Sequence, residues 1–478
     1  MHSIDNQPEN ITLEKLFELN NQNISTIKKI DSSLLLGEVI DMMDPIPKNI
    51  KKIYLSPKQR AGHFGCIGTT RIGKTRLLSY MSSSDIKAGR SVIIVDPKGD
   101  TELLSSSIAA SVEAGRLEEF MFISPIYPDY SIKIDPLAYY YIMDELVDHV
   151  ISGIESKEKY FVDVAAEVTT AVLSYFIVKS KHYDTYDTIN LYDIKKYIDY
   201  ESLRQIKTEV FNLKDIGKTE EIRELAQDVY LMINHILNSP PDFFSKVSSS
   251  LRTILTQLTS STTGKIIGKA KTNEFIKRFE EGKPVILYCN TGSLLARRTA
   301  HIIAKMLISM LQSAVGRALS SGIKINPPLC VYLDEGHNVL YRGIEELFNK
   351  SGGANVWVHF FTQSFAQMEE AIGHEITRSI IDNISTWIYM RVNHHQTVME
   401  IEKSLPVKKI FELVISTGDA RATFNLKEKQ EKLFMAENII KLKPRYFYLR
   451  NEGHFYKGIV PEVPLPWLNI QFPSVRVI

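Results

Sequence analysis

The sequence predicts an α/β protein whose central, mostly parallel sheet is interrupted by an inserted all-helical domain. Three observations support this prediction. A glycine-rich loop at residues 68–75 stands between a short apolar run and a helical pattern. Several other apolar runs have the length and β-branched composition of strands buried on both faces of a sheet. Residues 136–275, in contrast, show apolar residues at helical spacing only.

The composition is that of an ordinary globular protein. The chain has 478 residues, of which 44% are hydrophobic and 24% charged, so it is long enough for two or three domains. The net charge of +1 excludes a globally basic protein, so any contact with nucleic acid must come from a local patch or from the lumen of an assembly. Cys66, Cys289 and Cys330 lie in apolar runs without metal-ligand spacing, which is typical of reduced, buried thiols in a cytoplasmic protein.

No membrane-spanning helix is expected. The N-terminus lacks the basic and apolar regions of a secretory signal. The two most apolar segments, residues 161–178 and 300–315, are each interrupted by two ionisable side chains, so neither provides about 18 uninterrupted apolar residues.

Residues 1–50 are expected to form an N-terminal extension. Its first 30 residues are polar and asparagine-rich, with a possible short helix at 13–19. A strand is predicted at residues 34–40 and another at 53–55. We expect these strands to pack on the following domain as a small β appendage.

The glycine-rich loop matches the pattern GxxxxGK[ST] between a strand and a helix, which is typical of a phosphate-binding P-loop. Its glycines allow the backbone N–H groups to surround a phosphate chain, and the helix N-terminus favours the anion. Lys74 would contact the β- and γ-phosphates, and the Thr75 hydroxyl would bind Mg²⁺. The predicted ligands are therefore ATP and Mg²⁺. The predicted binding residues are Gly68, Thr69, Thr70, Arg71, Ile72, Gly73, Lys74, Thr75 and Arg76.

The first part of the nucleotide-binding domain is predicted to span residues 51–135. A β-branched strand at 92–95 is followed by a turn that contains Asp96, Lys98 and Asp100. Ligands of parallel sheets bind beyond the carboxyl ends of the strands, where this turn lies. The turn residues could contact the ligand or only shape the turn, and the sequence leaves both readings open.

Strands return in the second part of the nucleotide-binding domain, predicted at residues 276–478. One strand ends at Asp334-Glu335, the acids that a P-loop enzyme needs to hold Mg²⁺ and to polarise the attacking water. We assign the metal role to Asp334 and the general base to Glu335. Gln363 ends the next strand, where its amide could contact the γ-phosphate or the water. Residues 417–432 are read as polar loops.

Phosphoryl transfer in assembled ATPases commonly uses an arginine from a neighbouring subunit. Arg342, Arg378 and Arg391 lie near strand ends and are candidates for this role. The sequence alone does not choose among them, and Arg391 is kept as the candidate catalytic residue.

With these elements in place, the chain resembles the type IV secretion coupling ATPases of the TraD/TraG kind, in the HerA–FtsK superfamily. The resemblance extends over most of residues 50–465. It rests on GTTRIGKTRLL (68–78), VIIVDPKGD (92–100), YLDEGHNV (332–339), ELFNKSGGANVWVHFFTQSFAQMEEAIG (346–373) and NISTWIYMRV (383–392). It implies a RecA-like P-loop motor domain, a helical domain facing DNA or cargo, and a hexamer with a central pore. The implied task is ATP-driven delivery of a DNA–relaxase substrate to a secretion channel during conjugation.

Two departures from the family are visible. Its members begin with two transmembrane helices, which are not expected here, so a cytoplasmic protein recruited to the inner face of the membrane by a partner is implied. Relatives also tend to carry an arginine in an NKGRGAG stretch, where this chain has Gly352. If that arginine acts in trans, either Lys350 or Arg391 has taken over its task or hydrolysis is slow. An ATPase that powers protein export, pilus assembly or DNA processing without conjugation remains an alternative, as does a non-hydrolysing cargo adaptor.

Overall fold

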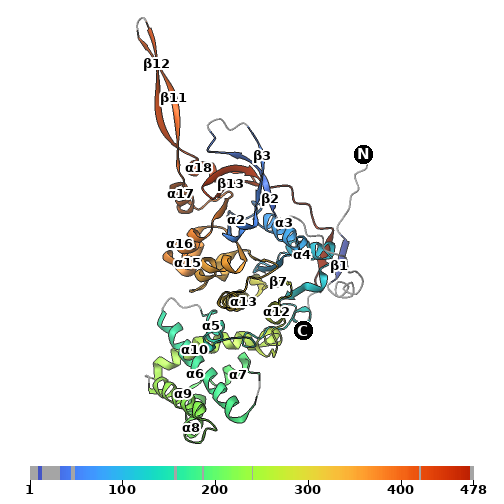
Figure 1. Ribbon diagram of the computed structural model, residues 1–478, viewed down its shortest axis with the longest axis vertical. Coiled ribbons are helices and arrows are strands. Elements are labelled where there is room, and N and C mark those ends of the chain that lie inside the picture. The colour runs from blue at the N-terminus through green and yellow to red at the C-terminus, as the bar shows by residue number, and fades with distance from the viewer. Residues whose placement is uncertain are drawn as a thin grey trace.

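The centre of the molecule is an 11-stranded sheet in the order β3-β2-β14-β13-β10-β4-β9-β8-β5-β7-β6. A computed structural model describes residues 9–12, 33–44, 49–154, 159–185, 188–238, 241–418 and 421–473. In Figure 1 the sheet and its covering helices occupy the middle of an elongated molecule, with a helical unit at the lower end and a long β-hairpin at the upper end.

The strands from β10 to β6 run parallel to one another. Each is short and almost completely buried, as the continuous apolar runs of the sequence predict. The α/β fold with a mostly parallel sheet is therefore confirmed. These strands are β4 (Phe64–Ile67), β5 (Ser91–Asp96), β6 (Phe120–Ile123), β7 (Ile286–Asn290), β8 (Leu329–Leu333), β9 (Val356–Thr362) and β10 (Thr386–Tyr389).

The other four strands extend the sheet in antiparallel fashion beyond β10. They are β13 (Tyr446–Asn451), β14 (His454–Ile459), β2 (Leu34–Asp41) and β3 (Lys51–Leu55). The N-terminal strands do more than pack on this domain as a small β appendage, because β2 pairs with β14 and continues the main sheet. That pairing joins segments about 400 residues apart, which local sequence patterns do not reveal. The helix predicted at residues 13–19 lies outside the described residues.

Helices cover both faces of the sheet. One face of β5 contributes Val92 and Ile94 to a core shared with α3 (Lys74–Lys87) and α4 (Thr101–Glu113). The opposite face contributes Ile93 and Val95 to a core shared with α13 (Ser293–Ser320). Alternate residues of a strand point to opposite faces, so a strand that is apolar throughout needs a helical layer on each side. Shorter elements are α2 (Pro57–Ala61), the 3₁₀ helix η4 (Gly336–Val339), α14 (Glu345–Lys350), α15 (Phe365–Ile372), α16 (His374–Asn383), α17 (His395–Lys403) and α18 (Ala436–Ile440).

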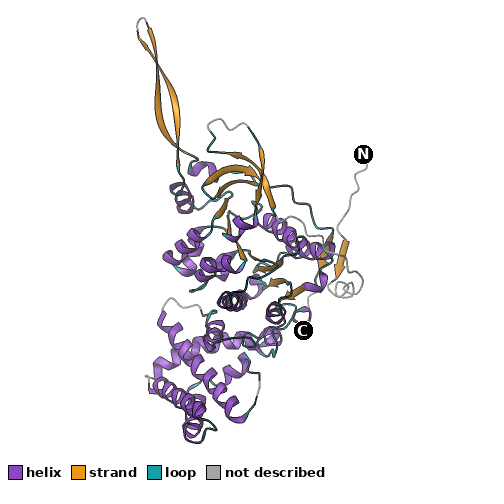
Figure 2. Cartoon of the chain, viewed as in Figure 1, coloured by secondary structure: helices purple, strands orange, loops and turns teal. Residues whose placement is uncertain are grey.

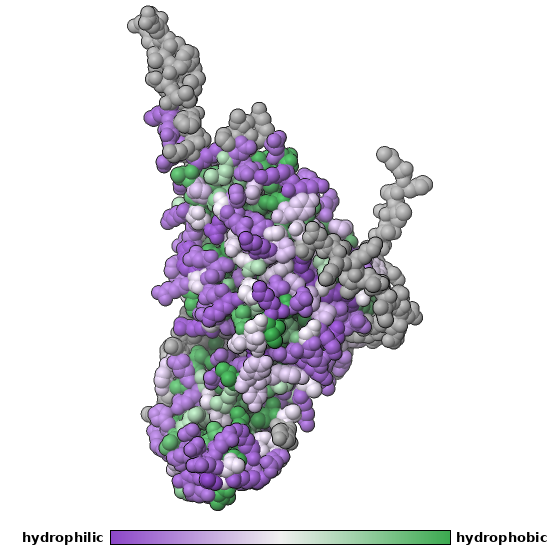
Figure 3. Space-filling view, in the orientation of Figure 1, coloured by the Kyte–Doolittle hydropathy of each residue, from purple (hydrophilic) through white to green (hydrophobic). Residues whose placement is uncertain are grey.

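The chain between β6 and β7 forms the helical unit at the lower end of Figure 2. Its elements are α5 (Met143–Ile151), α6 (Lys159–Tyr183), α7 (Leu191–Lys196), α8 (Tyr200–Ile216), α9 (Glu220–Asn238), α10 (Pro241–Thr259), α11 (Ser261–Thr263), a π-helical turn (Gly264–Gly268) and α12 (Glu274–Glu280). The entering and leaving segments lie side by side, since Ile134 forms an antiparallel bridge with Asn273. On the face of the molecule shown in Figure 3, the surface of this unit carries apolar residues scattered among hydrophilic ones.

Two helices, at Tyr160–Tyr183 and Ser293–Ser320, are long and apolar enough to cross a membrane by length and composition. Neither was expected to qualify from the sequence. Of the most apolar window of each, 44% and 72% respectively is buried inside the protein. The second helix in particular, α13, packs as a core helix between the sheet and α5.

Most of the segment predicted as polar loops, residues 417–432, is strand: its described residues are 417–418 and 421–432, and they belong to two paired strands. β11 (Val407–Gly418) and β12 (Arg421–Lys432) pair antiparallel along their full length and project from the sheet unit (Figure 1). The many charged residues of β12 hide the apolar alternation of an ordinary strand. Pairing with β11 satisfies the backbone hydrogen bonds, so the strand forms in spite of its composition.

Candidate functional site

The glycine-rich loop joins the carboxyl end of β4 to α3 and lies at the edge where β5, β8 and β9 also end. Arg71 and Gly73 have positive φ angles of 59° and 111°, which turn the backbone tightly around the loop. A Cβ atom at Gly68 would lie 2.9 Å from the Cβ of Met390, so only glycine fits there. No side chain caps the N-terminus of α3, which leaves its N–H groups directed at this edge.

Lys74 lies across the loop that precedes it. Its ammonium group donates hydrogen bonds to the carbonyl oxygens of Gly68 (2.6 Å) and Thr69 (3.1 Å) and is 5% exposed. These partners are neutral carbonyls, so the positive charge of Lys74 stays available to an anion within the loop.

The loop is also held from outside by its neighbours in the sheet. The N–H of Thr69 donates to the carbonyl of Arg391 (2.7 Å), and the N–H of Gly68 donates to the carbonyl of Thr362 (3.2 Å). The N–H of Arg445 donates to the carbonyl of Ile72 (3.2 Å). Sequence reasoning did not identify Thr362 and Arg445, because these contacts use backbone atoms and have no sequence signal.

Asp334 and Glu335 directly follow β8 and face the loop. Asp334 is 1% exposed, and burial, with the nearby charges of Asp96 and Glu335, raises the pKa of Asp334 to about 7, against the opposing effect of Lys74. Glu335 has a φ of 44°, an uncommon conformation for a residue with a side chain.

Gln363 follows β9 and contacts Glu335. Its amide nitrogen lies 3.0 Å from each oxygen of the Glu335 carboxylate. The Nδ1 atom of His337 lies 3.7 Å from the same carboxylate. The structure therefore brings together Lys74, Asp334, Glu335 and Gln363, which are separated by nearly 300 residues in the sequence.

In the turn after β5, Asp96 has a structural function. Its buried carboxylate accepts hydrogen bonds from the N–H groups of Lys98 (3.0 Å), Gly99 (2.9 Å) and Asp100 (2.6 Å), and from the hydroxyl of Tyr288 (2.7 Å). Asp100 then caps α4, accepting from the second and third N–H groups of its first turn. Asp96 thus shapes the turn, while Lys98 and Asp100 line the adjacent cavity.

The cavity at this edge has a volume of about 690 Å³. Its walls combine loop residues, cations and acids, with Leu103 as the main apolar contributor. Loop N–H groups, the Lys74 ammonium and the helix N-terminus suit a polyphosphate. Mg²⁺ prefers oxygen ligands, which are available from the Thr75 hydroxyl in the lining and from Asp334, the residue before Glu335. The lining residues are Thr69, Thr70, Arg71, Gly73, Lys74, Thr75, Arg76, Ser79, Lys98, Asp100, Glu102, Leu103 and Glu335.

The three candidate arginines lie in different places. Arg391 adjoins the loop through its carbonyl, and its Nε atom is buried without a hydrogen-bond partner among the described residues. Arg378 pairs with Glu400 at 2.9 Å. Arg342 lines a different cavity, between α13 and α14. Only Arg391 therefore contacts the loop of its own chain.

Gly352 lies in a segment that has no room for an arginine. A Cβ atom at this position would lie 2.4 Å from the carbonyl oxygen of Ala61. At the next residue, Gly353, a Cβ atom would have its nearest neighbour 3.7 Å away, in Leu319. Lys350, the other cation of the segment, is exposed and forms an ion pair with Glu346.

Comparison with known proteins supports the resemblance seen in the sequence. Residues 328–444 match a family model described as the TraM recognition site of TraD and TraG. No curated protein matches the sequence. The matched region contains Asp334, Glu335, Gln363 and Arg391 but not the glycine-rich loop.

Several solved structures share the fold. The bacterial conjugative coupling protein TrwBdeltaN70 matches with 14% identity and a TM-score of 0.59, covering 96% of this chain and 93% of that chain. TrwB in complex with the ATP analogue ADPNP matches with 15% identity and a TM-score of 0.57, covering 94% and 92%. VirB4 of Thermoanaerobacter pseudethanolicus matches with 10% identity and a TM-score of 0.54, covering 92% and 99%. These matches show the RecA-like P-loop fold, and the family model carries the resemblance to TraD and TraG over residues 328–444.

Proposed function

We propose that this protein is an ATP-hydrolysing coupling protein that moves DNA, with its relaxase, toward a type IV secretion channel. The observation that supports hydrolysis is the convergence of Lys74, Asp334, Glu335 and Gln363 at one edge of the sheet. A protein that only binds nucleotide has no need of a second acid beside the metal ligand.

In this proposal each residue has a separate task. Lys74 and the loop N–H groups bind the β- and γ-phosphates, while Thr75 and Asp334 hold Mg²⁺, which neutralises phosphate charge when bound. Glu335 takes the proton of the attacking water. Gln363 orients the Glu335 carboxylate through its amide, and the two groups must separate or rotate to admit the water.

Arg391 is proposed to act within its own subunit. Its carbonyl fixes the loop at Thr69, and its Nε, which is buried without a partner among the described residues, would have to turn toward the nucleotide to donate a hydrogen bond to a phosphate oxygen. Gly352 offers no side chain to a neighbouring subunit, and Lys350 of the same segment is paired with Glu346.

The assembly and the partners follow from the resemblance. We propose a homo-hexamer in the cytoplasm that is recruited to the inner face of the membrane by a partner and contacts DNA, cargo and secretion channel components. The family model named for TraM recognition supports a partner-binding function for residues 328–444. We divide the chain into an N-terminal extension (1–50), a motor domain in two parts (51–135 and 276–478) and an inserted helical domain (136–275).

ATP turnover with and without DNA tests the proposal. Wild-type protein is expected to hydrolyse ATP faster with single- or double-stranded DNA, and Glu335→Gln is expected to bind ATP without turning it over. Arg298→Gln, at an exposed position, is the matched control. Equal slow turnover by wild type and Glu335→Gln would favour a non-hydrolysing adaptor.

A secretion ATPase without conjugative function is the second candidate, supported by the fold match to VirB4. It predicts turnover that requires Glu335 and Lys74 but does not respond to DNA. The same assay therefore separates the two candidates.

A further inference from the structure

Helix α13 has a polar stripe that ATP hydrolysis does not explain. Every fourth residue from Arg297 to Ser313 is polar, and all of these side chains line one cavity along a largely buried helix. The stripe extends about 24 Å at 1.5 Å per residue. Its members are Arg297, His301, Lys305, Ser309 and Ser313.

Two members of the stripe, His301 and Lys305, are only 8% and 9% exposed. Burial of a lysine is costly and is uncommon in a core helix. Surface helices place lysine in solvent, whereas this lysine points into the protein. Both His301 and Lys305 line a cavity.

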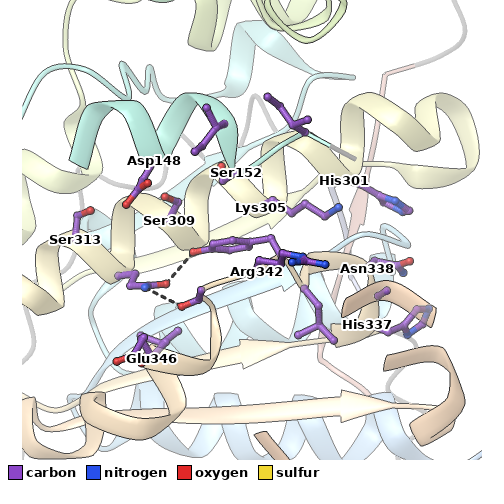
Figure 4. Close-up of a pocket in the computed structure, with 18 of the residues that line it drawn as sticks. Asp148, Ser152, His301, Lys305, Ser309, Ser313, His337, Asn338, Arg342 and Glu346 are labelled. Atoms are coloured by element: carbon purple, nitrogen blue, oxygen red, sulfur yellow. Dashed lines mark hydrogen bonds between the residues drawn. The ribbon is translucent and has the colours of Figure 1, made fainter. Parts of the chain in front are cut away.

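The stripe faces a cavity of about 1010 Å³ between the sheet unit and the helical unit (Figure 4). α5 forms one wall, α13 another, and η4, α14 and α15 close the remaining side. Val162 of α6 also lines the cavity, which is larger than the cavity at the glycine-rich loop.

The charges of the cavity are divided between its two ends. In Figure 4, His301, Lys305 and Arg342 gather at one end. Arg297 also lines the cavity, and neither it nor Arg342 forms an ion pair among the described residues. Glu370 of α15 also lines the cavity.

The other end is acidic and rich in hydrogen-bonding groups. Asp148, Ser309 and Ser313 lie there, with Glu346 on the opposite wall (Figure 4). The side-chain carbonyl of Gln312 accepts a hydrogen bond from the Tyr341 hydroxyl at 2.9 Å. Glu346 pairs with Lys350, so Asp148 is the main source of negative charge at this end.

We propose that this cavity binds a small phosphate ester. The phosphate would lie between His301, Lys305 and Arg342, and the hydroxyl- or amine-bearing remainder would extend toward Asp148, Ser309 and Ser313. Cationic side chains and hydrogen-bond acceptors at opposite ends match a ligand of that polarity.

The shape and charge of the cavity favour a small ligand over a nucleic-acid strand. A strand lying along the cavity would place phosphates beside Asp148 and Glu346, which repel them. His301 and Lys305 are also too buried to be reached by a strand that crosses the surface. A compact ligand can enter and turn its charged end toward them.

The site adjoins the proposed hydrolytic centre. Glu335 lines the cavity at the glycine-rich loop, whereas His337 and Asn338, two and three residues later, line this one. A ligand here would therefore contact the segment that carries the general base, a consequence that rests on the proposed function. Binding itself does not depend on it.

Isothermal titration calorimetry with inorganic pyrophosphate tests the proposal. Pyrophosphate is expected to bind wild-type protein at two sites per chain, one at the glycine-rich loop and one in this cavity. Lys305→Met is expected to lose one site and Lys74→Ala the other. Arg298→Gln, on the same helix but outside the cavity, should keep both.

A single wild-type site that disappears in Lys74→Ala would overturn the cavity proposal, as would two sites retained in Lys305→Met. A single site that disappears only in Lys305→Met would instead support the cavity and contradict the loop assignment. If Lys305→Met does not fold, Arg342→Gln replaces it and should weaken cavity binding at least tenfold. Displacement of pyrophosphate from Lys74→Ala by a 15-nucleotide single strand would assign the cavity to nucleic acid and reject the small ligand.

Discussion

Helix α3 has a buried charged side chain near each end, and the two differ in whether a partner of opposite charge lies beside them. Lys74 begins the helix at the glycine-rich loop, and Asp85 lies near its other end, about 16 Å away at 1.5 Å per residue. Both side chains are buried. At one end the charges have direct partners of opposite sign, and at the other they do not.

At the Asp85 end every charge is compensated. The carboxylate accepts hydrogen bonds from Arg60 (2.6 and 2.5 Å), Arg90 (2.6 Å) and the Tyr332 hydroxyl. Trp357 lies 5.0 and 5.1 Å from the two guanidinium groups. Although burial acts to raise it, the pKa of Asp85 is lowered by the charge of Arg60, which keeps the group ionised.

At the Lys74 end the charges are less compensated. Lys74 contacts neutral carbonyls. Burial, together with the charges of two other acids, raises the pKa of Asp334. Burial alone therefore does not mark a functional site. A buried charge that lacks a partner is available to a ligand, whereas a paired one stabilises the fold.

Loss of the Lys74 charge should have the largest effect. Lys74→Ala is expected to reduce ATP turnover by on the order of 10³-fold, because it removes a cation that stabilises charge in the transition state. Steady-state turnover measures this change. The free energy of unfolding should stay within about 1 kcal/mol of wild type, since neutral carbonyls are the lysine's hydrogen-bond partners. Unchanged turnover would contradict the site assignment.

Loss of the Asp85 charge should lower the stability of the protein and leave its nucleotide site intact. Asp85→Asn leaves Arg60 and Arg90 buried without a carboxylate and is expected to destabilise the protein by about 3–5 kcal/mol. Urea denaturation followed by circular dichroism measures the loss. Nucleotide affinity of the folded fraction should be retained. A fully stable Asp85→Asn protein would show that this cluster does not stabilise the fold.

A side chain added in the closely packed region near the Asp85 end should lower the free energy of unfolding by a smaller amount. Gly352→Ala is expected to cost about 1–3 kcal/mol, because the new Cβ would meet the Ala61 carbonyl at 2.4 Å. Gly353→Ala is the matched control and should change the unfolding free energy by about 0.5 kcal/mol or less, since it has space. Equal stability of the two variants would refute the steric argument.

The pH dependence of Mg²⁺ binding should reveal the uncompensated acid. Because the pKa of Asp334 is about 7, Mg²⁺ must displace a proton from this carboxyl group below pH 7. The affinity for Mg²⁺ in the presence of ADP should therefore rise by up to about tenfold per pH unit toward pH 7 and level off above it. Calorimetry from pH 5.5 to 8.5 measures this rise, and Asp334→Asn should abolish it. Without ligand the sign is opposite: the raised pKa makes protonated Asp334 a stabilising group that is lost as the pH rises through 7.

Much of the sheet could be predicted from the sequence because its strands are apolar on both faces. The runs that became β5, β7, β8 and β9 are recognisable without tertiary context, and the α/β class follows from them. The long β11–β12 hairpin was missed because charged residues interrupt its pattern, and the pairing of the N-terminal strands with the main sheet was missed because their partner, β14, lies at the other end of the chain.

The sequence by itself determined the glycine-rich loop, the acids at the end of β8 and the identity of the strands, since each depends on neighbours within about ten residues. Only the tertiary structure decided that Gln363 contacts Glu335, that Arg391 adjoins the loop while Arg342 and Arg378 do not, and that Asp96 shapes a turn. It also decided that the polar stripe of α13 lines a cavity. The physical reason is that the contacts and the burial of a side chain depend on how segments distant in the sequence pack together. This packing decides whether a charged side chain has a partner of opposite charge.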